Sequence, residues 1–200
     1  MKKLAISLML SLGLVAGADA GDAAAGKKIA GACAACHGQD GNSPAPSFPK
    51  IAGLGEAYIY KQLMDFKSGE RQNAIMMGQV AALSEKQMQD LAAYYNSQTR
   101  TVGYAAEDKV ELGQKVYRAG NTATGVPACM ACHSMDGSGM DAAGFPALGG
   151  QHADYIKSQL VMFQEDKRAN DNAQVMRDIA KRMSNKEIDA VSSYIQGLHR

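Results

Sequence analysis

The residues of this chain best suited to chemistry are its four cysteines, which all occur in one repeated pattern. Residues 33–37 read Cys-Ala-Ala-Cys-His, and residues 129–133 read Cys-Met-Ala-Cys-His. In a C-x-x-C-H pattern the two thiols add across the vinyl groups of a haem, and the adjoining imidazole lies beneath the ring, where it can ligate the iron. The pattern therefore predicts two covalently bound haem c groups. The expected thioether residues are Cys33, Cys36, Cys129 and Cys132, and the expected iron ligands are His37 and His133.

Paired cysteines also serve three other purposes. A thioredoxin-like redox pair belongs to a strand-rich βαβ context, which this sequence does not indicate. Two pairs that share a zinc ion stand much closer together than the 96 positions that separate these two. Structural disulfides within each pair would leave unexplained the histidine that follows both. Covalent haem is the interpretation that accounts for all six residues.

The second half of the chain repeats the first, with small shifts in spacing. The matched residues keep one order along both halves, which indicates two copies of one domain. We expect an N-terminal domain over residues 21–100 and a C-terminal domain over residues 101–200, joined near residues 99–106, where helical periodicity is lost. Beyond the cysteine motifs, the matched pairs include Phe48-Pro49 with Phe145-Pro146, Tyr58 with Tyr155, Gln62 with Gln159, Phe66 with Phe163, Arg71 with Arg168, Asn73 with Asn170, Met76 with Met176, and Tyr94 with Tyr194.

The first twenty residues have the composition of an export signal. Two lysines precede an apolar stretch from Leu4 to Val15, and Ala18-Asp19-Ala20 offers the small residues that a signal peptidase recognises. A retained membrane anchor is the alternative, but a dozen apolar residues fall short of the roughly 20 that span a bilayer. We expect residues 1–20 to be a cleaved signal peptide, a mature chain that starts at Gly21, and a periplasmic location.

Each half is predicted to be all-helical with long loops. One helix begins near Ala23, or near Glu107 in the second half, and ends in the cysteine motif. Amphipathic helices are expected over residues 56–67 and 153–166. The last helix of each half opens with a capping box, Ser84-x-x-Gln87 and Ser184-x-x-Glu187. No stretch alternates as a strand does, and aromatic residues form only 6% of the chain, so small domains of this composition need a bulky group to complete their cores.

The second axial ligand decides between an electron carrier and a catalyst. A methionine keeps both axial positions filled and raises the reduction potential, whereas an open position permits peroxide or oxygen chemistry. Met76 and Met176 each stand eight residues before the capping serine of the last helix, in loops. Met77 competes with Met76, but Arg177 occupies the corresponding place in the second half, so only the Met76 register gives a matched pair. We expect Met76 and Met176 to be the second axial ligands.

These motifs together resemble the dihaem cytochrome c4 family. The shared features are the two C-x-x-C-H motifs, the Phe-Pro loops, the Tyr-x-x-x-Gln-Leu helices and the Arg-x-Asn segments before the methionines. The resemblance implies two tandem class I cytochrome c domains, with haem edges facing one another, that carry electrons toward a terminal oxidase and perform no catalysis. The implied partners are a quinol-oxidising complex or small cytochrome as donor and a terminal oxidase as acceptor, with loose membrane association possible. A dihaem peroxidase is the alternative.

The resemblance also suggests roles for residues around the haems. The carbonyls of Pro49 and Pro146 would accept a hydrogen bond from the ligating histidines. Haem propionates would meet the repeated arginines and tyrosines, and the repeated asparagines would touch the methionine sulfur. His152 and His199 have no repeat partners and are not needed as ligands. With a formal net charge of +1 the chain lacks the basic excess of a nucleic-acid-binding protein.

Overall fold

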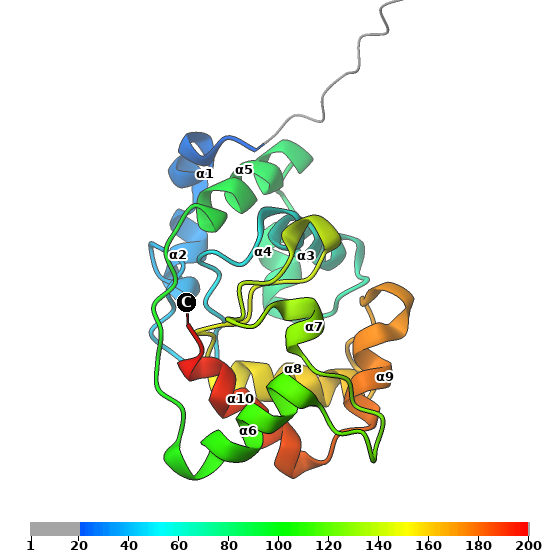
Figure 1. Ribbon diagram of the computed structural model, residues 1–200. Helices are drawn as coiled ribbons and strands as arrows, with labels where there is room; N and C mark the ends of the chain where they lie inside the picture. Colours follow the sequence, from blue (N-terminus) through cyan, green and yellow to red (C-terminus); the bar gives the residue numbers. More distant parts are fainter. Residues whose placement is uncertain (1–20, 200) are drawn as a thin grey trace, which may run out of the picture.

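The structure is a computed structural model that describes residues 21–199, so the expected signal peptide lies outside the described residues. Two helical lobes lie one above the other, with the first half at the top of the view and the second half at the bottom (Figure 1). Within the described residues there is no strand, and only two isolated β-bridges occur, one between Asn121 and Val126 and one between Met140 and Phe145. The predicted all-helical class is confirmed.

In each lobe the first and last helices cross at a glycine. Helix α1 (Ala23–Ile29) packs on α5 (Glu85–Asn96), and α6 (Glu107–Ala119) packs on α10 (Asn185–Gly197). A Cβ at Gly26 would lie 2.0 Å from the Asp90 carbonyl oxygen, and one at Gly113 would lie 2.4 Å from that of Ala190. Because no side chain fits at such distances, these glycines allow the two helix backbones to come into contact.

The predicted capping boxes both form. The Ser84 hydroxyl accepts from the Gln87 amide and the Ser184 hydroxyl accepts from the Glu187 amide, while each third-residue side chain accepts from the serine amide in return. The middle helices also agree with the sequence to within two residues: they are α3 (Glu56–Ser68) and α8 (Ala153–Gln164). These elements depend on contacts between neighbours in the sequence, which explains why the pattern reveals them.

Two expectations about local structure are wrong. In the second half no continuous helix leads from Glu107 into the cysteine motif: a loop follows α6, and the motif lies on a separate short helix, α7 (Met130–His133). The crossing glycine Gly113 stands 16 positions before Cys129, whereas Gly26 stands seven positions before Cys33, which lies on α2 (Gly31–His37). The second half therefore has nine more residues between the crossing glycine and the first cysteine.

The methionines predicted to lie in loops lie instead in short helices, α4 (Ala74–Val80) and α9 (Val175–Lys181). Asn73 starts the first of these, because its side-chain oxygen accepts from the Met76 amide at 3.0 Å. A helix of seven residues has too few turns to show periodicity in the sequence, which explains why the pattern did not reveal it.

The two lobes fill their cores with different residues at equivalent places. In the first lobe Ala30 is small, and the hydroxyl of buried Tyr95 donates to its carbonyl. In the second lobe Tyr117 occupies the place of Ala30 and donates to the Ser134 carbonyl at 2.7 Å, while Ile195 replaces Tyr95. The ring is thus supplied by the last helix in one lobe and by the first helix in the other, which conserves core volume.

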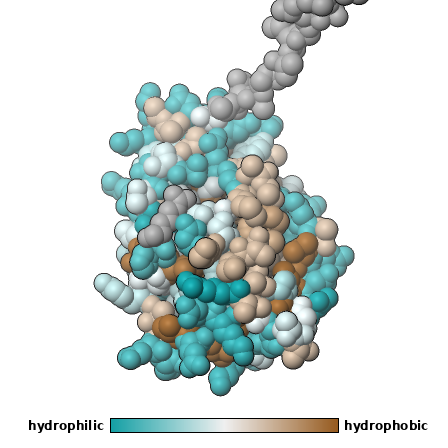
Figure 2. Space-filling view, in the orientation of Figure 1, coloured by the Kyte–Doolittle hydropathy of each residue, from teal (hydrophilic) through white to brown (hydrophobic). Residues whose placement is uncertain are grey.

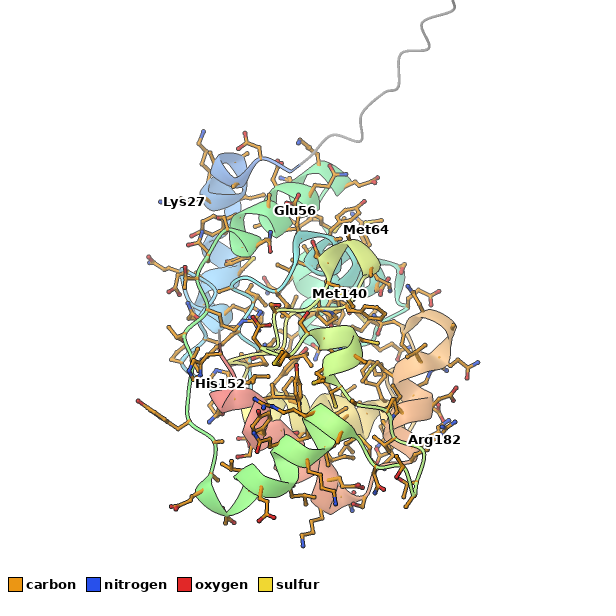
Figure 3. All side chains as sticks on the ribbon, viewed as in Figure 1. Lys27, Glu56, Met64, Met140, His152 and Arg182 are labelled. Carbon is orange, nitrogen blue, oxygen red and sulfur yellow. The ribbon has the colours of Figure 1, made fainter. Side chains whose placement is uncertain are left out.

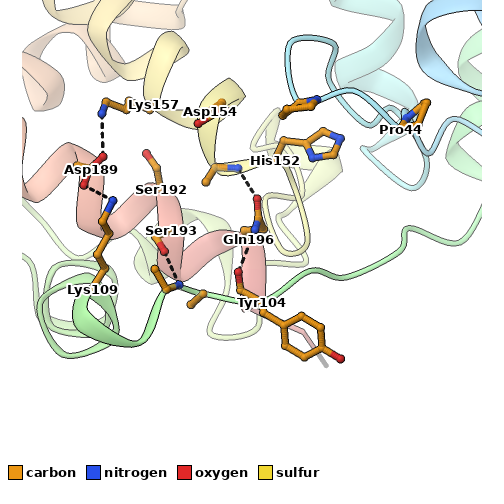
Figure 4. A pocket seen from close by; sticks show the side chains of 14 residues that line it. Pro44, Tyr104, Lys109, His152, Asp154, Lys157, Asp189, Ser192, Ser193 and Gln196 are labelled. Carbon is orange, nitrogen blue, oxygen red and sulfur yellow. Dashed lines mark hydrogen bonds and ion pairs between the residues drawn. The ribbon is translucent and has the colours of Figure 1, made fainter.

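The segment between the lobes is extended, as expected from its lack of periodicity. Figure 4 shows how the second lobe holds it. Gln196 donates to the Tyr104 carbonyl and accepts from the Ala153 amide, each at 2.9 Å, and Ser193 accepts from the Ala106 amide. The linker therefore lies against α10 along much of its length.

Replacing Gly113 with Ala should lower the free energy of unfolding by about 1–3 kcal/mol, because the new methyl group meets the backbone of α10 and forces the helices apart. Thermal unfolding of the mature protein, followed by circular dichroism, measures the change. Gly31→Ala is the matched control, since no heavy atom lies within 4 Å of a Cβ there. Equal melting temperatures for the two variants would contradict the proposed role of the crossing.

Candidate haem sites

Each cysteine motif ends in a buried histidine that is fixed by a proline. The Nδ1 atom of His37 lies 2.9 Å from the Pro49 carbonyl oxygen, and that of His133 lies 2.9 Å from the Pro146 carbonyl oxygen. A carbonyl oxygen only accepts, so Nδ1 carries the proton and Nε2 keeps its lone pair. The predicted proline contacts are confirmed, and each ring is oriented so that Nε2 can bind a metal.

The surroundings of the two histidines are also the same. A phenylalanine packs edge-on against each ring, Phe48 at 6.4 Å and Phe145 at 6.2 Å between centroids. Burial lowers the pKa of both histidines, and the proline carbonyl opposes that change only in part. Both imidazoles therefore stay neutral, which is the form that ligates iron.

Cys33 and Cys36 lie on α2, Cys132 lies on α7 and Cys129 directly precedes it, and none of the four is paired in a disulfide. Burial raises the pKa of the Cys33 thiol, and it raises that of Cys129 to about 11. A redox-active C-x-x-C pair needs a thiolate with a lowered pKa, so the thioredoxin alternative does not fit these residues. Within residues 21–199 no three His, Cys, Asp or Glu side chains come together as a metal site, which leaves the zinc alternative without support.

The two predicted methionine ligands are equally placed in their lobes. Met76 is the third residue of α4 and Met176 is the second residue of α9, and both side chains are half-buried. Met77 is 38% exposed, and its counterpart Arg177 donates from Nε to the Asp171 carboxylate at 2.8 Å. Burial and the repeat therefore both favour Met76 over Met77.

The repeated arginines meet across the boundary between the lobes, a contact that sequence reasoning missed. Arg71 donates to Gln62 in its own lobe, and also to the Tyr155 hydroxyl at 3.0 Å and to Gln159 at 2.8 Å in the other lobe. Arg168 makes the reverse set of bonds, to Gln159 in its own lobe and to Tyr58 and Gln62 opposite, at distances from 2.8 to 3.1 Å. Equivalent residues of the repeat thus exchange partners.

This cluster holds more positive than negative charge. Arg71 and Arg168 are only 9% and 6% exposed, and their guanidinium groups lie 4.7 and 4.5 Å from the ring centres of Phe66 and Phe163. The side chains that accept their hydrogen bonds are hydroxyls and amides, so neither buried cation has a bonded carboxylate among the described residues. Buried cations without a bonded carboxylate are costly, and a cofactor that brings carboxylates, as haem does with its propionates, would compensate them.

Burial opposes ionisation of Tyr58 in the same cluster, but the charges of Arg168 and Arg71 prevail and lower its pKa. The donor set at the boundary therefore fits a group with carboxylates, and the histidines, thiols and methionines fit a haem iron and its vinyl groups. These observations support the expected haem sites on the structure's own chemistry.

The repeated asparagines make different contacts in the two lobes. Asn73 uses its side chain to cap α4, and Asn170 donates to Gln62 at 2.9 Å and to Asp65. The Nδ2 group of Asn170 is thus committed to contacts other than the methionine sulfur, whereas Asn73 caps through Oδ1 and its contact with the sulfur stays a prediction. His152 is likewise no ligand: its Nε2 lies 3.0 Å from the hydroxyl and 2.9 Å from the carbonyl oxygen of Ser43 in the first lobe. Figure 3 shows His152 near the level where the lobes meet.

A further residue closes the boundary from the second lobe. Asp141, in the short helix η1 (Asp141–Ala143), accepts from the backbone amides of Ala57 and Tyr58 at 3.1 and 3.2 Å and so caps α3 of the first lobe. A Cβ at Gly55 would lie 2.4 Å from this carboxylate, so glycine is required for the approach. The repeat has no matching aspartate in the first half, which is why the sequence did not reveal the cap.

Comparison with known proteins agrees with this geometry. The family model for cytochrome c matches residues 23–99 and again residues 110–199. Cytochrome c4 of Pseudomonas aeruginosa is 52% identical, with all of both chains covered, and cytochrome c4 of Stutzerimonas stutzeri is 49% identical with the same coverage. The crystal structure of reduced recombinant cytochrome c4 from Pseudomonas stutzeri has a TM-score of 0.88 at 49% identity and covers 90% of this chain and 100% of that one.

This chain belongs to the cytochrome c4 family. Like other members of the cytochrome c4 family, it has two tandem cytochrome c domains with two covalently bound haem c groups, and it is a dihaem electron-transfer cytochrome. Across residues 21–199 no helix combines the length and the apolar composition needed to cross a membrane.

Acidification from about pH 7 to pH 5.5 should lower the free energy of unfolding. Burial lowers the pKa of His152, which is no iron ligand, below the ordinary 6.5, so the unfolded chain takes up a proton in this range that the folded chain does not. Carboxylates act at lower pH, because the ordinary pKa values of Asp and Glu are 3.8 and 4.5. Denaturant titrations at several pH values measure the effect, and His152→Gln should flatten it. Stability that rises on acidification would contradict the prediction.

Proposed function

We propose that this protein is a periplasmic electron carrier whose two haem irons are each held between a histidine and a methionine. The observation that carries the proposal is that both lobes present a histidine fixed by a proline carbonyl and a half-buried methionine at the same repeat position. The iron ligands are His37 with Met76 and His133 with Met176. The haems are attached through Cys33 with Cys36 and Cys129 with Cys132.

A bound haem supplies one-electron cycling between ferrous and ferric iron. The residues of the chain limit the structural rearrangement that accompanies the change of oxidation state. The cysteines would attach the ring covalently, the proline carbonyls fix the histidine rings, and the short helices α4 and α9 carry Met76 and Met176. With a histidine and a methionine both supplied by the chain, the iron would need little rearrangement between its two oxidation states, which favours electron transfer over catalysis.

The two domains, residues 21–100 and 101–200, act as one rigid pair. Support comes from the crossed arginine cluster, the cap that Asp141 places on α3, and the bonds of Arg100 to the carbonyls of Ala52, Ala147 and Gly149. A fixed pair holds the two haems at a constant separation. Electrons then pass between the haems faster than they leave to a partner.

The peroxidase alternative has no support, because a peroxidase needs an iron whose second axial position opens. Both lobes here offer a methionine at the same place. We therefore assign no catalytic activity to the protein. Carbon monoxide distinguishes the two functions: a carrier keeps its low-spin reduced spectrum when the gas is added, whereas an open iron changes it.

The partners are redox proteins of the respiratory chain: a quinol-oxidising complex or small cytochrome as donor and a terminal oxidase as acceptor. Figure 2 shows a band of moderately apolar surface down the centre of this face, over α7 and η1. Exposed Met135 and Met140 lie in this part of the chain, after the second cysteine motif. A small apolar patch of this kind suits the brief, low-area contacts of electron-transfer partners.

The decisive experiment is intact mass spectrometry of protein matured in a host that attaches haem c. Two haem masses on a chain that starts at Gly21 support both the cofactor assignment and export through the predicted signal peptide. One haem, or none, would overturn the dihaem assignment, and a chain that retains residues 1–20 would overturn the predicted cleavage.

Replacing Cys36 with Ala should impair covalent haem attachment in the N-terminal domain alone, and Cys132→Ala should do the same in the C-terminal domain. Each small core depends on its own haem, so the affected lobe should also lose helical content. The haem-to-protein ratio, measured by mass and by pyridine haemochrome absorbance, should fall from two to one. A ratio that stays at two would show that these cysteines do not attach the haems.

Replacing either Met76 or Met176 with His should keep the iron low-spin but lower the reduction potential of that haem, because a thioether favours ferrous iron more than imidazole does. The near-infrared band that marks sulfur ligation should fall by about half in each single variant, since one of two such irons is changed. Met77→Leu serves as the control and should leave the band at full strength. If the loss occurs in that control instead, Met77 is the ligand.

A further inference from the structure

Gln151 of the C-terminal domain binds both the backbone amide and the backbone carbonyl of Lys50 in the N-terminal domain. Gln151 is 1% exposed, its Oε1 accepts from the Lys50 amide at 2.9 Å, and its Nε2 donates to the Lys50 carbonyl at 2.7 Å. The same Oε1 accepts from the His152 amide at 3.0 Å. The side chain is therefore anchored in its own domain while it reaches across the boundary.

Lys50 directly follows Pro49, whose carbonyl oxygen accepts the hydrogen bond from His37. Its own side chain is fixed as well: Lys50 is 6% exposed, and its Nζ donates to the carbonyls of Thr101 at 2.7 Å and Gly150 at 3.1 Å. The backbone and the side chain of Lys50 are thus both held by residues that follow the N-terminal domain in sequence.

The second lobe lacks this arrangement. Ala147 follows Pro146 and has no side chain to anchor, and its amide donates to the Leu54 carbonyl at 3.3 Å. Leu54 stands in the repeat position of Gln151, so its backbone carbonyl takes the place of the glutamine side chain, and the Ala147 carbonyl accepts instead from Arg100 at 3.1 Å. The residue after Pro49 is therefore fixed at its amide and its carbonyl by one side chain, and by its own buried side chain as well, whereas the residue after Pro146 is fixed by two separate groups of the first lobe.

We propose that Gln151 is a positioning residue for the N-terminal haem: through Lys50 it fixes the Pro49 carbonyl, and through that carbonyl it fixes the ring of His37. The proposal rests on the proposed function only in taking His37 as an iron ligand. A firm hydrogen bond from Nδ1 makes the imidazole a stronger donor to iron and stabilises the ferric state. Gln151 therefore lowers the reduction potential of the N-terminal haem and leaves that of the C-terminal haem unchanged.

The test replaces Gln151 with Met, which keeps the length of the side chain and removes both hydrogen bonds. We expect the reduction potential of the N-terminal haem to rise while that of the C-terminal haem stays at its wild-type value. Spectroelectrochemistry measures the potentials, and paramagnetic NMR assigns them to the two haems and reports the His37 ring. Amide hydrogen exchange over residues 48–51 should become faster, a readout that does not depend on the iron.

Asp141→Ala is the matched control, because Asp141 also crosses the boundary to accept from backbone amides of the N-terminal domain but touches neither proline. It should weaken the domain contact without moving the potential of the N-terminal haem. Gln151→Asn is the milder second variant: its shorter side chain cannot reach both groups of Lys50, so it should give a smaller rise of the same sign.

An unchanged N-terminal potential in both Gln151 variants would overturn the proposal, and so would an equal shift in the Asp141 control. Each variant is first checked for two covalent haems and for the sulfur-ligation band. Wild-type protein without those features would refute the proposed function instead, so the two failures are distinguishable.

Discussion

A single hydrogen bond in each lobe, from a histidine ring to a proline carbonyl, governs how the surrounding chain is arranged. His37 ends α2 and His133 ends α7, and the loop that follows each must return after 12 or 13 residues to bring its proline to the ring. Gly41 and Gly137 turn these loops with positive φ angles, where a residue with a Cβ would be strained.

The contact between the two domains depends on two buried arginines whose hydrogen bonds neither domain supplies alone. Arg71 and Arg168 are buried, and each takes acceptors from the opposite domain as well as from its own. Separating the domains would leave the Tyr155 and Tyr58 hydroxyls and both guanidinium groups to find water instead. The boundary is therefore polar at its centre, and its hydrogen-bond geometry specifies one arrangement of the domains more sharply than apolar contact would.

The sequence predicted those features that depend on residues close together in the chain. The C-x-x-C-H motifs, the two capping boxes and the middle helices belong to this group, and the repeat was visible because these local patterns recur in the same order. Contacts between distant residues were missed, because a pattern states which residues are present and not which ones meet. Gly26 against Asp90, Asp141 against α3 and Gln151 against Lys50 each join positions more than 60 apart, and only the folded chain brings them together.

Duplication gives both haem sites the same set of predicted ligands, so differences between them must come from the residues that the repeat does not preserve. Tyr117 fills from the first helix a space that Tyr95 fills from the last helix in the other lobe, which places a phenol differently beside each cysteine motif. Lys50 brings a buried cation to a position where Ala147 is neutral. A buried positive charge opposes the ferric state of any nearby haem, whereas an aliphatic side chain has no such effect. Two sites with equal ligands can thus differ in reduction potential because the domain boundary is chemically unequal on its two sides.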